Sequence, residues 1–251
     1  MSFSGKVVIV TGASSGIGAA VAVMFCKEGA SVALVARNEK KLMDVSVKCS
    51  LVGGKHIIIK ADVSNDEDAK RIISETVTKF GQLDVLVNNA GIIAFGSILE
   101  GTILETYDKI MKINLRAIVH LTMLAAPHLV KTKGNIINIS SIAGSIVVDS
   151  FFSAYCCSKA GLDHFTRSTA AELAASGVRV NAISPGPVVT DIFDNAGFTP
   201  DLVSKLQTPL GRVSQSEEIA DLILYLASDK ANGITGSNIV SDNGCMLHML
   251  K

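Results

Sequence analysis

The chain has 251 residues, of which 48% are hydrophobic, and its 23 lysines and arginines balance its 23 aspartates and glutamates. Because the formal net charge is zero, no long-range field draws the chain to nucleic acid or to an anionic membrane surface, and we expect small-molecule partners. No uninterrupted apolar run approaches the roughly 20 residues that cross a bilayer, and the first predicted strand begins too early for a signal peptide, so we expect a cytoplasmic protein without a membrane span.

Seven short apolar segments predict β-strands, and most of the stretches between them have the periodicity of amphipathic helices. This alternation predicts a single α/β domain of the doubly wound Rossmann type over residues 1–251, with a seven-stranded parallel sheet covered by helices on both faces. Ligands of such domains bind at the carboxyl ends of the strands. The predicted strands are residues 6–11, 31–36, 56–61, 83–87, 134–140, 178–184 and 238–241.

The first strand runs directly into Thr11-Gly-Ala-Ser-Ser-Gly-Ile-Gly18 and then a helix rich in small residues. Glycines let the backbone approach a pyrophosphate closely, and the N-terminus of the following helix offers unpaired N–H groups to the anion. The spacing differs from the common Gly-x-Gly-x-x-Gly fingerprint, and glycine turns also have purely structural roles. The segment predicts a dinucleotide phosphate site, with a structural turn as the alternative.

The second strand ends in Ala36-Arg37-Asn38. A site that prefers NAD usually has an acidic side chain here, which accepts hydrogen bonds from the ribose 2′-hydroxyl. Arg37 instead offers a planar guanidinium that suits a 2′-phosphate, so the residues favour NADP(H), with NAD(H) still possible. The alternative is that Arg37 is a solvated loop residue.

Several polar residues follow later strands or interrupt apolar helical faces. Asp62 follows the third strand and could equally cap the helix that starts after Ser64. Asn114 interrupts an apolar helical face, where an unpaired amide would be costly. Tyr155 and Lys159 are one helical turn apart, so the lysine charge is expected to lower the pKa of the phenol from its usual value near ~10. Alone, that spacing also fits a buried tyrosine beside a solvated lysine.

Five cysteines, at positions 26, 49, 156, 157 and 245, form no Cys-x-x-Cys pair, and the five histidines are scattered along the chain. The cysteines are interpreted as small buried hydrophobes in a reducing compartment. No metal-ligand spacing is present, so a metal-free site is expected.

Six motifs in this order resemble the classical short-chain dehydrogenase/reductase family. They are Thr11-Gly12-x-x-x-Gly16-Ile17-Gly18, Asn88-Asn89-Ala90-Gly91, Asn114, Ser140-Ser141, Tyr155-x-x-x-Lys159 and Pro185-Gly186. The second serine matches the family's catalytic serine, although it is fourteen residues before the tyrosine, one more than expected. We assign the extra residue to an insertion in the loop 145–153, and Ser145 is a weaker candidate.

The resemblance implies a catalytic set of Asn114, Ser141, Tyr155 and Lys159 and hydride transfer between a nicotinamide and a carbonyl carbon. Tyr155 would donate the proton, Ser141 would orient the carbonyl, Lys159 would hold the ribose, and Asn114 would anchor a relay water. Many NADP-binding members carry a second basic residue in the glycine turn, where this chain has serines. The implied cofactor residues are Gly12, Ser14, Ser15, Gly16, Ile17, Gly18, Arg37, Asp62, Val63, Asn88, Ala90, Gly91, Tyr155, Lys159, Pro185, Gly186, Val188 and Thr190.

The segments expected to line the substrate pocket are apolar and include a variable loop at about 187–210. They predict a hydrophobic ketone or aldehyde as substrate, although the same residues could be loop core or oligomer interface. The alternatives are an NAD-dependent alcohol dehydrogenase, a 3-ketoacyl reductase and a catalytically silent cofactor-binding scaffold. Family members pair through helices at 102–130 and 152–175, which implies a homotetramer or homodimer. The predicted pocket residues are Ile93, Phe95, Ser141, Ile146, Val147 and Phe193.

Overall fold

The computed structural model describes residues 2–192 and 208–248, and within them seven parallel strands form one sheet in the order β3-β2-β1-β4-β5-β6-β7. The predicted Rossmann-type sheet is therefore confirmed. The order reverses between β1 and β4, and this reversal is where ligands bind in doubly wound folds. The strands are β1 (Val7–Thr11), β2 (Ser31–Ala36), β3 (Lys55–Lys60), β4 (Val85–Asn88), β5 (Asn135–Ile139), β6 (Arg179–Pro185) and β7 (Asn238–Ser241).

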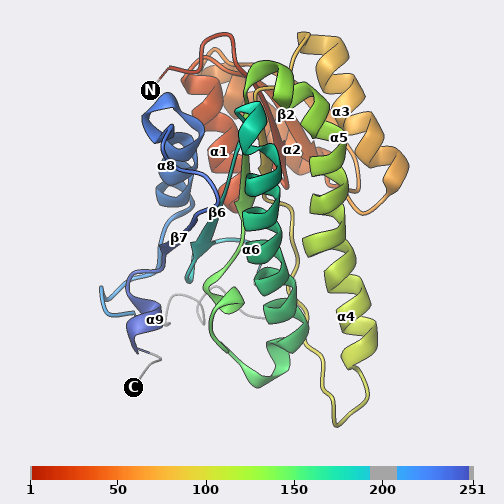
Figure 1. Cartoon of the computed structure of the whole chain (residues 1–251), viewed down its shortest axis with the longest axis vertical. Coiled ribbons are helices and arrows are strands. Elements are labelled where there is room, and N and C mark those ends of the chain that lie inside the picture. The colour runs from red at the N-terminus through yellow and green to blue at the C-terminus, as the bar shows by residue number, and fades with distance from the viewer. Residues whose placement is uncertain (1, 193–207, 249–251) are drawn as a thin grey trace.

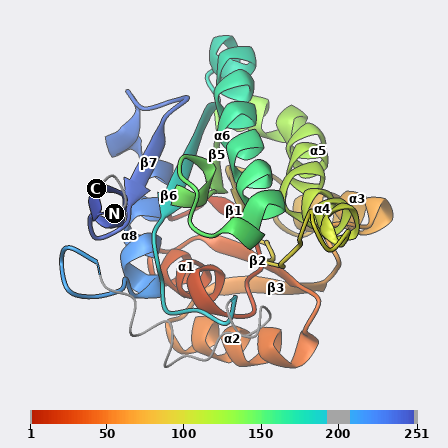
Figure 2. The same cartoon turned by 90° about the horizontal axis from the view of Figure 1, so that it is seen from below.

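Helices cover both faces of the sheet (Figure 1). Helices α1, α2 and α8 lie on one face, and α3, α5 and α6 lie on the other (Figure 2). The larger helices are α1 (Gly16–Lys27), α2 (Glu39–Leu51), α3 (Asp66–Phe80), α4 (Ile103–Met111), α5 (Ala117–Thr132), α6 (Ser153–Leu173) and α8 (Ser216–Ala227). Short elements are the π-helical turn η1 (Lys112–Arg116), the 3₁₀ turns η2 (Ile142–Gly144), η3 (Ser150–Phe152), η4 (Ala174–Ser176) and η6 (Asp229–Ala231), and α9 (Cys245–His248).

The central strand β1 shows why its sequence is apolar throughout. All five of its residues are buried, because helices cover both faces of a parallel sheet. Val8 and Val10 belong to the core beneath α1 and α8, whereas Ile9 belongs to the core beneath α3 and α5. The two-residue period of a strand thus divides one short segment between two hydrophobic cores, and it holds the end of β1 rigidly at the switch point.

Helices α4 and α5 join through η1 into one helical run, Ile103–Thr132. By length and composition alone this run is apolar enough to cross a membrane. The sequence did not predict such a run, because polar residues interrupt its apolar residues. In the fold the run contacts α3 and α6, and Leu121 and Leu129 are fully buried core residues. Buried core helices pass the same test of length and composition.

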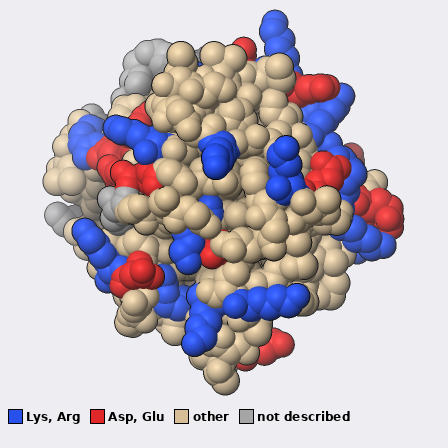
Figure 3. All heavy atoms as spheres, turned by 90° about the horizontal axis from the view of Figure 1, so that it is seen from above, with Lys and Arg blue, Asp and Glu red and all other residues tan. Residues whose placement is uncertain are grey.

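The surface and the cysteines bear on the expected partners and compartment. Basic and acidic side chains are interspersed with large uncharged areas on the face shown in Figure 3.

Cys26 and Cys49 are buried as expected, but Cys157 is exposed and Cys156 and Cys245 are partly exposed. The interpretation of all five as buried hydrophobes was wrong for these three, because their helices leave part of those side chains outside the core.

Candidate active site

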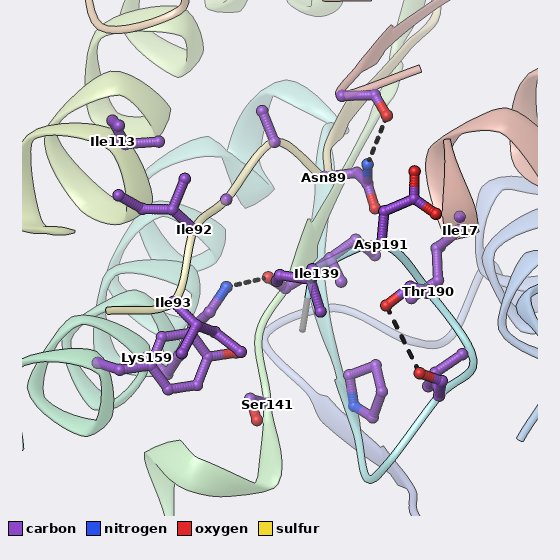
Figure 4. Close-up of a pocket in the computed structure, with 18 of the residues that line it drawn as sticks. Ile17, Asn89, Ile92, Ile93, Ile113, Ile139, Ser141, Lys159, Thr190 and Asp191 are labelled. Atoms are coloured by element: carbon purple, nitrogen blue, oxygen red, sulfur yellow. Dashed lines mark hydrogen bonds between the residues drawn. The ribbon is translucent and has the colours of Figure 1, made fainter. Parts of the chain in front are cut away.

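A cavity of about 770 Å³ opens at the carboxyl ends of the strands, a volume typical of small-molecule sites. It brings together residues from the ends of β1, β2, β3, β4, β5 and β6, which are far apart in the sequence (Figure 4). Of the predicted cofactor residues, those that line it are Gly12, Ser14, Ser15, Gly16, Ile17, Arg37, Asp62, Val63, Ala90, Gly91, Tyr155, Lys159, Pro185, Gly186, Val188 and Thr190. Gly18 and Asn88 do not line it.

The glycine turn after β1 is packed too tightly for side chains. Gly12 and Gly16 have positive φ angles of 67° and 51°. A Cβ on Gly18 would lie 2.2 Å from the Gly12 carbonyl oxygen, so this glycine permits the turn to pack on itself although it does not line the cavity. Asn89 fixes the turn by donating from Nδ2 to the Thr11 carbonyl oxygen at 2.9 Å and to the Gly12 carbonyl oxygen at 3.3 Å.

The start of α1 suits an anion such as a cofactor pyrophosphate. Its N-cap residue, Ser15, makes no side-chain capping hydrogen bond, and the first turn carries no acidic residue. The N–H groups of the first turn are therefore not capped by that side chain, and the positive end of the helix dipole is not offset by a nearby carboxylate. Ser14, Ser15, Gly16 and Ile17 present this helix start to the cavity.

At the end of β2, Arg37 is exposed and lines the cavity, and no acidic residue occupies the position of Ala36. The next residue, Asn38, caps α2 by accepting a hydrogen bond from the Lys41 backbone N–H at 3.0 Å. The Lys41 ammonium reaches across to Asp191, with 2.5 Å between Nζ and Oδ2. This ion pair joins α2 to the segment after β6 at the edge of the cavity.

Asp62 does not cap α3. The cap is Asn65, whose side chain accepts hydrogen bonds from the backbone N–H groups of Glu67 and Asp68. Asp62 Oδ1 instead accepts from the Ser64 backbone N–H at 2.9 Å and from the Ser64 hydroxyl at 2.8 Å. The carboxylate thus closes the turn after β3, and it lines the cavity.

The two asparagines of the motif after β4, Asn88 and Asn89, lie in different surroundings, and Asn88, the one predicted to bind the cofactor, does not line the cavity. Asn88 is buried, and its Nδ2 donates to Asn138 Oδ1 at 2.9 Å, so it links β4 to β5 inside the sheet. Asn89 is the side chain that reaches the cavity. The prediction of Asn88 came from the family resemblance, and its role toward the cofactor stays a prediction.

Tyr155 and Lys159 lie one turn apart on α6, and Ser141 follows β5 on the same wall of the cavity. Lys159 Nζ donates to the Ile139 carbonyl oxygen at 2.8 Å and lies 5.7 Å from the centroid of the Tyr155 ring. The Ser141 hydroxyl accepts from the Ala143 backbone N–H at 3.2 Å, which orients it at the start of η2. Figure 4 shows the Lys159 ammonium turned toward Ile139 at the base of this wall.

The expected lowering of the phenol pKa was wrong. Burial raises the pKa of Tyr155 to about 12, and a hydrogen bond with Ser141 only partly opposes the rise. Burial also lowers the pKa of Lys159 to about 8, opposed by the negative charge of Asp163. Because both side chains are buried, the cost of removing their charged forms from water exceeds the benefit of their proximity. The phenol therefore keeps its proton at neutral pH.

Asn114 lies outside the cavity, in the π-helical turn η1, and is completely buried. Its Oδ1 accepts from the Ile92 backbone N–H, its Nδ2 donates to the Ile92 carbonyl oxygen, both at 2.9 Å, and Nδ2 also donates to the Ser158 hydroxyl at 3.3 Å. The amide thus holds the chain after β4 against α6, behind Lys159. Its predicted role at a relay water stays a prediction.

The apolar end of the cavity is built by partly different residues from those predicted. Ile93 and Ser141 line it, whereas Phe95, Ile146 and Val147 do not, and Phe193 lies outside the described residues. Phe95 stacks on Phe152 at 4.9 Å between ring centroids, and Val147 is 77% exposed. The apolar lining that sequence reasoning missed consists of Ile92, Ile113, Ile139, Ile142, Ala143 and Phe152. Val148, from the expected apolar segment with Ile146 and Val147, and Ile192, from the variable loop at about 187–210, do line the cavity. Phe152 is the N-cap residue of α6, three residues before Tyr155, and the two ring centroids are 6.2 Å apart.

Comparison with known proteins shows the family to which the chain belongs. A family model described as enoyl-(acyl carrier protein) reductase matches residues 12–246. A meso-2,3-butanediol dehydrogenase from Serratia marcescens is 37% identical, covering 97% of this chain and 96% of its own. A short-chain dehydrogenase/reductase of unknown function from Caenorhabditis elegans, crystallised with cofactor, is 36% identical with a TM-score of 0.92, covering 98% of this chain and 96% of its own. The chain belongs to the short-chain dehydrogenase/reductase family.

This short-chain dehydrogenase/reductase is an oxidoreductase of a family that uses a nicotinamide cofactor. A 3-oxoacyl-[acyl-carrier-protein] reductase from Thermotoga maritima is similar over the same extent, at 34% identity across 98% of this chain and the whole of its own. Relatives named for different activities therefore share one scaffold, so the substrate has to be argued from this cavity. Among the described residues, no group of three or more histidine, cysteine or acidic side chains could hold a metal ion.

Proposed function

We propose that this short-chain dehydrogenase/reductase is an NADPH-dependent carbonyl reductase, working in reverse as an alcohol dehydrogenase, whose substrate is a hydrophobic ketone or aldehyde. The observation that carries the proposal is one cavity lined by Ser141, Tyr155 and Lys159, by an apolar wall, and by Arg37. We also propose the predicted cytoplasmic location and the homotetramer or homodimer, which rest on the sequence and the family.

A nicotinamide cofactor supplies, when bound, the hydride that reduces a carbonyl carbon. Tyr155 is proposed to give its proton to the carbonyl oxygen, and the Ser141 hydroxyl to orient that oxygen. Lys159 is proposed to hold the nicotinamide ribose, with Asn114 keeping the neighbouring chain in place. The glycine turn and the first turn of α1 would bind the pyrophosphate, and Val188 and Thr190 would hold the carboxamide.

The preference for NADPH is supported by the charges at the cavity edge. Arg37 offers a guanidinium where an NAD-preferring site offers a carboxylate. The described acids that line the cavity already have partners: Asp62 accepts from Ser64, Asp149 accepts from the Phe151 backbone N–H at 2.8 Å, and Asp191 pairs with Lys41. None of them stands at the end of β2, so the local charge favours a 2′-phosphate.

A second candidate is a 3-ketoacyl reductase, which the similar Thermotoga protein favours. A β-ketoacyl thioester would place its ketone against the same Ser141 and Tyr155 hydroxyls and its chain along the apolar wall. A third candidate, an NAD-dependent alcohol dehydrogenase, would use the same catalytic residues, and it differs from the main proposal only in that Arg37 would not bind a 2′-phosphate. A silent cofactor-binding scaffold is disfavoured because it has no chemical need for a serine, tyrosine and lysine on one wall.

The test is the loss of absorbance of NADPH, and separately of NADH, with a panel of hydrophobic ketones, diketones, aldehydes and an acetoacetyl thioester. We expect turnover that favours NADPH, fastest with apolar ketones or aldehydes. Tyr155→Phe should lower kcat/KM by about 10²- to 10⁴-fold, the usual worth of a general acid, while NADPH binding measured by fluorescence is retained. Turnover with NADH alone would contradict the cofactor assignment, and full activity in Tyr155→Phe would overturn the mechanism.

A further inference from the structure

Asp163 is a buried carboxylate on α6, one turn beyond Lys159, and it has no role in the chemistry proposed so far. Asp163 is only 5% exposed, and its Oδ1 atom has no hydrogen-bond partner in the described part of the chain. Buried carboxylates are rare unless they are paired, because burying a charge without compensation is costly. A buried polar atom without a partner therefore calls for an explanation.

The carboxylate is enclosed between α6 and the turn that carries Ser141. Its Oδ2 atom would lie 2.7 Å from a Cβ on Gly144, and that same Cβ would lie 3.0 Å from the Lys159 carbonyl carbon. Only a glycine at the end of η2 lets the turn approach α6 this closely. The Ser140 hydroxyl lies on the same side and donates to the Lys159 carbonyl oxygen at 3.4 Å.

Asp163 is also the only described charge that opposes the effect of burial on Lys159. Burial lowers the pKa of Lys159, and the Asp163 charge raises it. The other groups around the ammonium are neutral at neutral pH: the Tyr155 phenol from α6, the Ile139 carbonyl from β5 and the Asn114 amide from η1.

The charge state of Asp163 itself depends on groups from two elements. Burial raises the pKa of Asp163, whereas the nearby Ser140 hydroxyl, after β5, and the charges of Lys159 and Arg167, on α6, lower it. Asp163 and Lys159 are both buried and lie one turn apart on α6, and no ion pair within 4 Å joins these two described residues. Their opposite charges therefore act on each other across the buried space between them, and each favours the charged form of the other.

We propose that Asp163 is a positioning residue, whose carboxylate keeps Lys159 in its ammonium form and holds the Ser141 turn against α6. The proposal rests on the function proposed above, because it assigns Asp163 to the same catalytic wall. Asp163 touches neither substrate nor cofactor in this assignment. It acts through Lys159 and through the packing of η2.

The direct test is an NMR titration of Lys159 in protein carrying ¹³C-labelled lysine, with the signal assigned by Lys159→Arg. Asp163→Asn keeps the shape of the side chain and removes its charge, so we expect the Lys159 midpoint to fall by about one pH unit, the size of a typical shift from a neighbouring charge. Glu172→Gln is the matched control, because it removes the same charge from the exposed face of the same helix. An unchanged midpoint in Asp163→Asn would overturn the proposal.

The activity readout separates positioning from folding. In Asp163→Asn we expect the alkaline limb of kcat/KM for reduction to move to lower pH, with a loss of about threefold to tenfold at pH 9 and little change at pH 6.5. Asp163→Glu should restore the wild-type profile in part, whereas a uniform loss at all pH values would indicate only damaged packing and would contradict the proposal. If the wild type turns over no carbonyl, the proposed function fails, and the NMR titration still decides the role of Asp163.

Discussion

At the scale of single residues, the pKa values of two buried side chains, Tyr155 and Lys159, determine how activity should depend on pH. The pKa of Tyr155 is raised to about 12 and that of Lys159 is lowered to about 8. In reduction the phenol must keep its proton and the lysine must keep its charge. The first loss of activity with rising pH is therefore expected from the lysine, at about pH 8.

Lys159→Met tests the same burial through stability. The lysine pKa is below its ordinary value of 10.5 in the folded chain, so between pH 8 and 10.5 the unfolded chain binds more protons, and this group makes stability rise with pH. The cost of the buried charge is fully present below pH 8. We expect Lys159→Met to have a higher Tm than the wild type at pH 7, with a gap that shrinks toward pH 9.5. A gap that stays constant across this range, measured by scanning fluorimetry, would show that the lysine is not desolvated.

Arg37→Asp tests the cofactor preference. The substitution removes the guanidinium and introduces a carboxylate next to the end of β2, so NADPH affinity should fall by about tenfold to a hundredfold while NADH affinity rises. Titration of each cofactor by fluorescence measures both changes. Lys79→Asp, at an exposed lysine at the end of α3, is the control for the change of charge. Equal effects of the two variants would make Arg37 a solvated loop residue.

The tight turn between β1 and α1 governs the cofactor site at the scale of elements. Gly18→Ala puts a Cβ 2.2 Å from the Gly12 carbonyl oxygen, and relieving that clash must move either the turn or the start of α1. We expect weaker cofactor binding, by tenfold or more, and a lower Tm, because the N–H groups of the helix no longer point into the cavity. Gly233→Ala is the control, since it meets no atom within 4 Å and its φ is not positive, and it should be neutral. Isothermal calorimetry measures the cofactor affinity of both variants. Equal affinities would contradict the role of the glycine turn in cofactor binding.

The elements also show which parts of the site the sequence could predict. Strand positions and the glycine turn follow from local patterns, and the structure has both where the sequence indicates them. The direction of the Tyr155 pKa could not be predicted, because it depends on burial by segments distant in sequence. Likewise, the burial of Asp163 could not be predicted, because it depends on the packing of η2 against α6. Which of Asn88 and Asn89 reaches the cavity depends on the strand register, which the sequence alone does not give.

At the scale of the whole molecule, the apolar run Ile103–Thr132 has two faces. One belongs to the core, and the other is exposed, with Leu104 at 72% and Met123 at 61%. Exposed apolar side chains on one helical run indicate contact with a protein surface or a membrane. The family-based expectation of a homotetramer or homodimer supplies one occupant, a second copy of this chain.

A double substitution of Leu104→Lys and Met123→Lys should therefore lower the sedimentation coefficient, because two charges per chain cannot be buried in an apolar contact without partners. The control is Met43→Lys, which places the same charge on α2, on the other side of the sheet, at a methionine that is 53% exposed. Wild type and control should sediment alike, as a dimer or tetramer. If the double variant keeps the wild-type size, α4 and α5 do not form the interface. If the wild type sediments as a monomer and floats with lipid vesicles while the double variant does not, the exposed face binds membranes and the prediction of a membrane-independent oligomer is wrong.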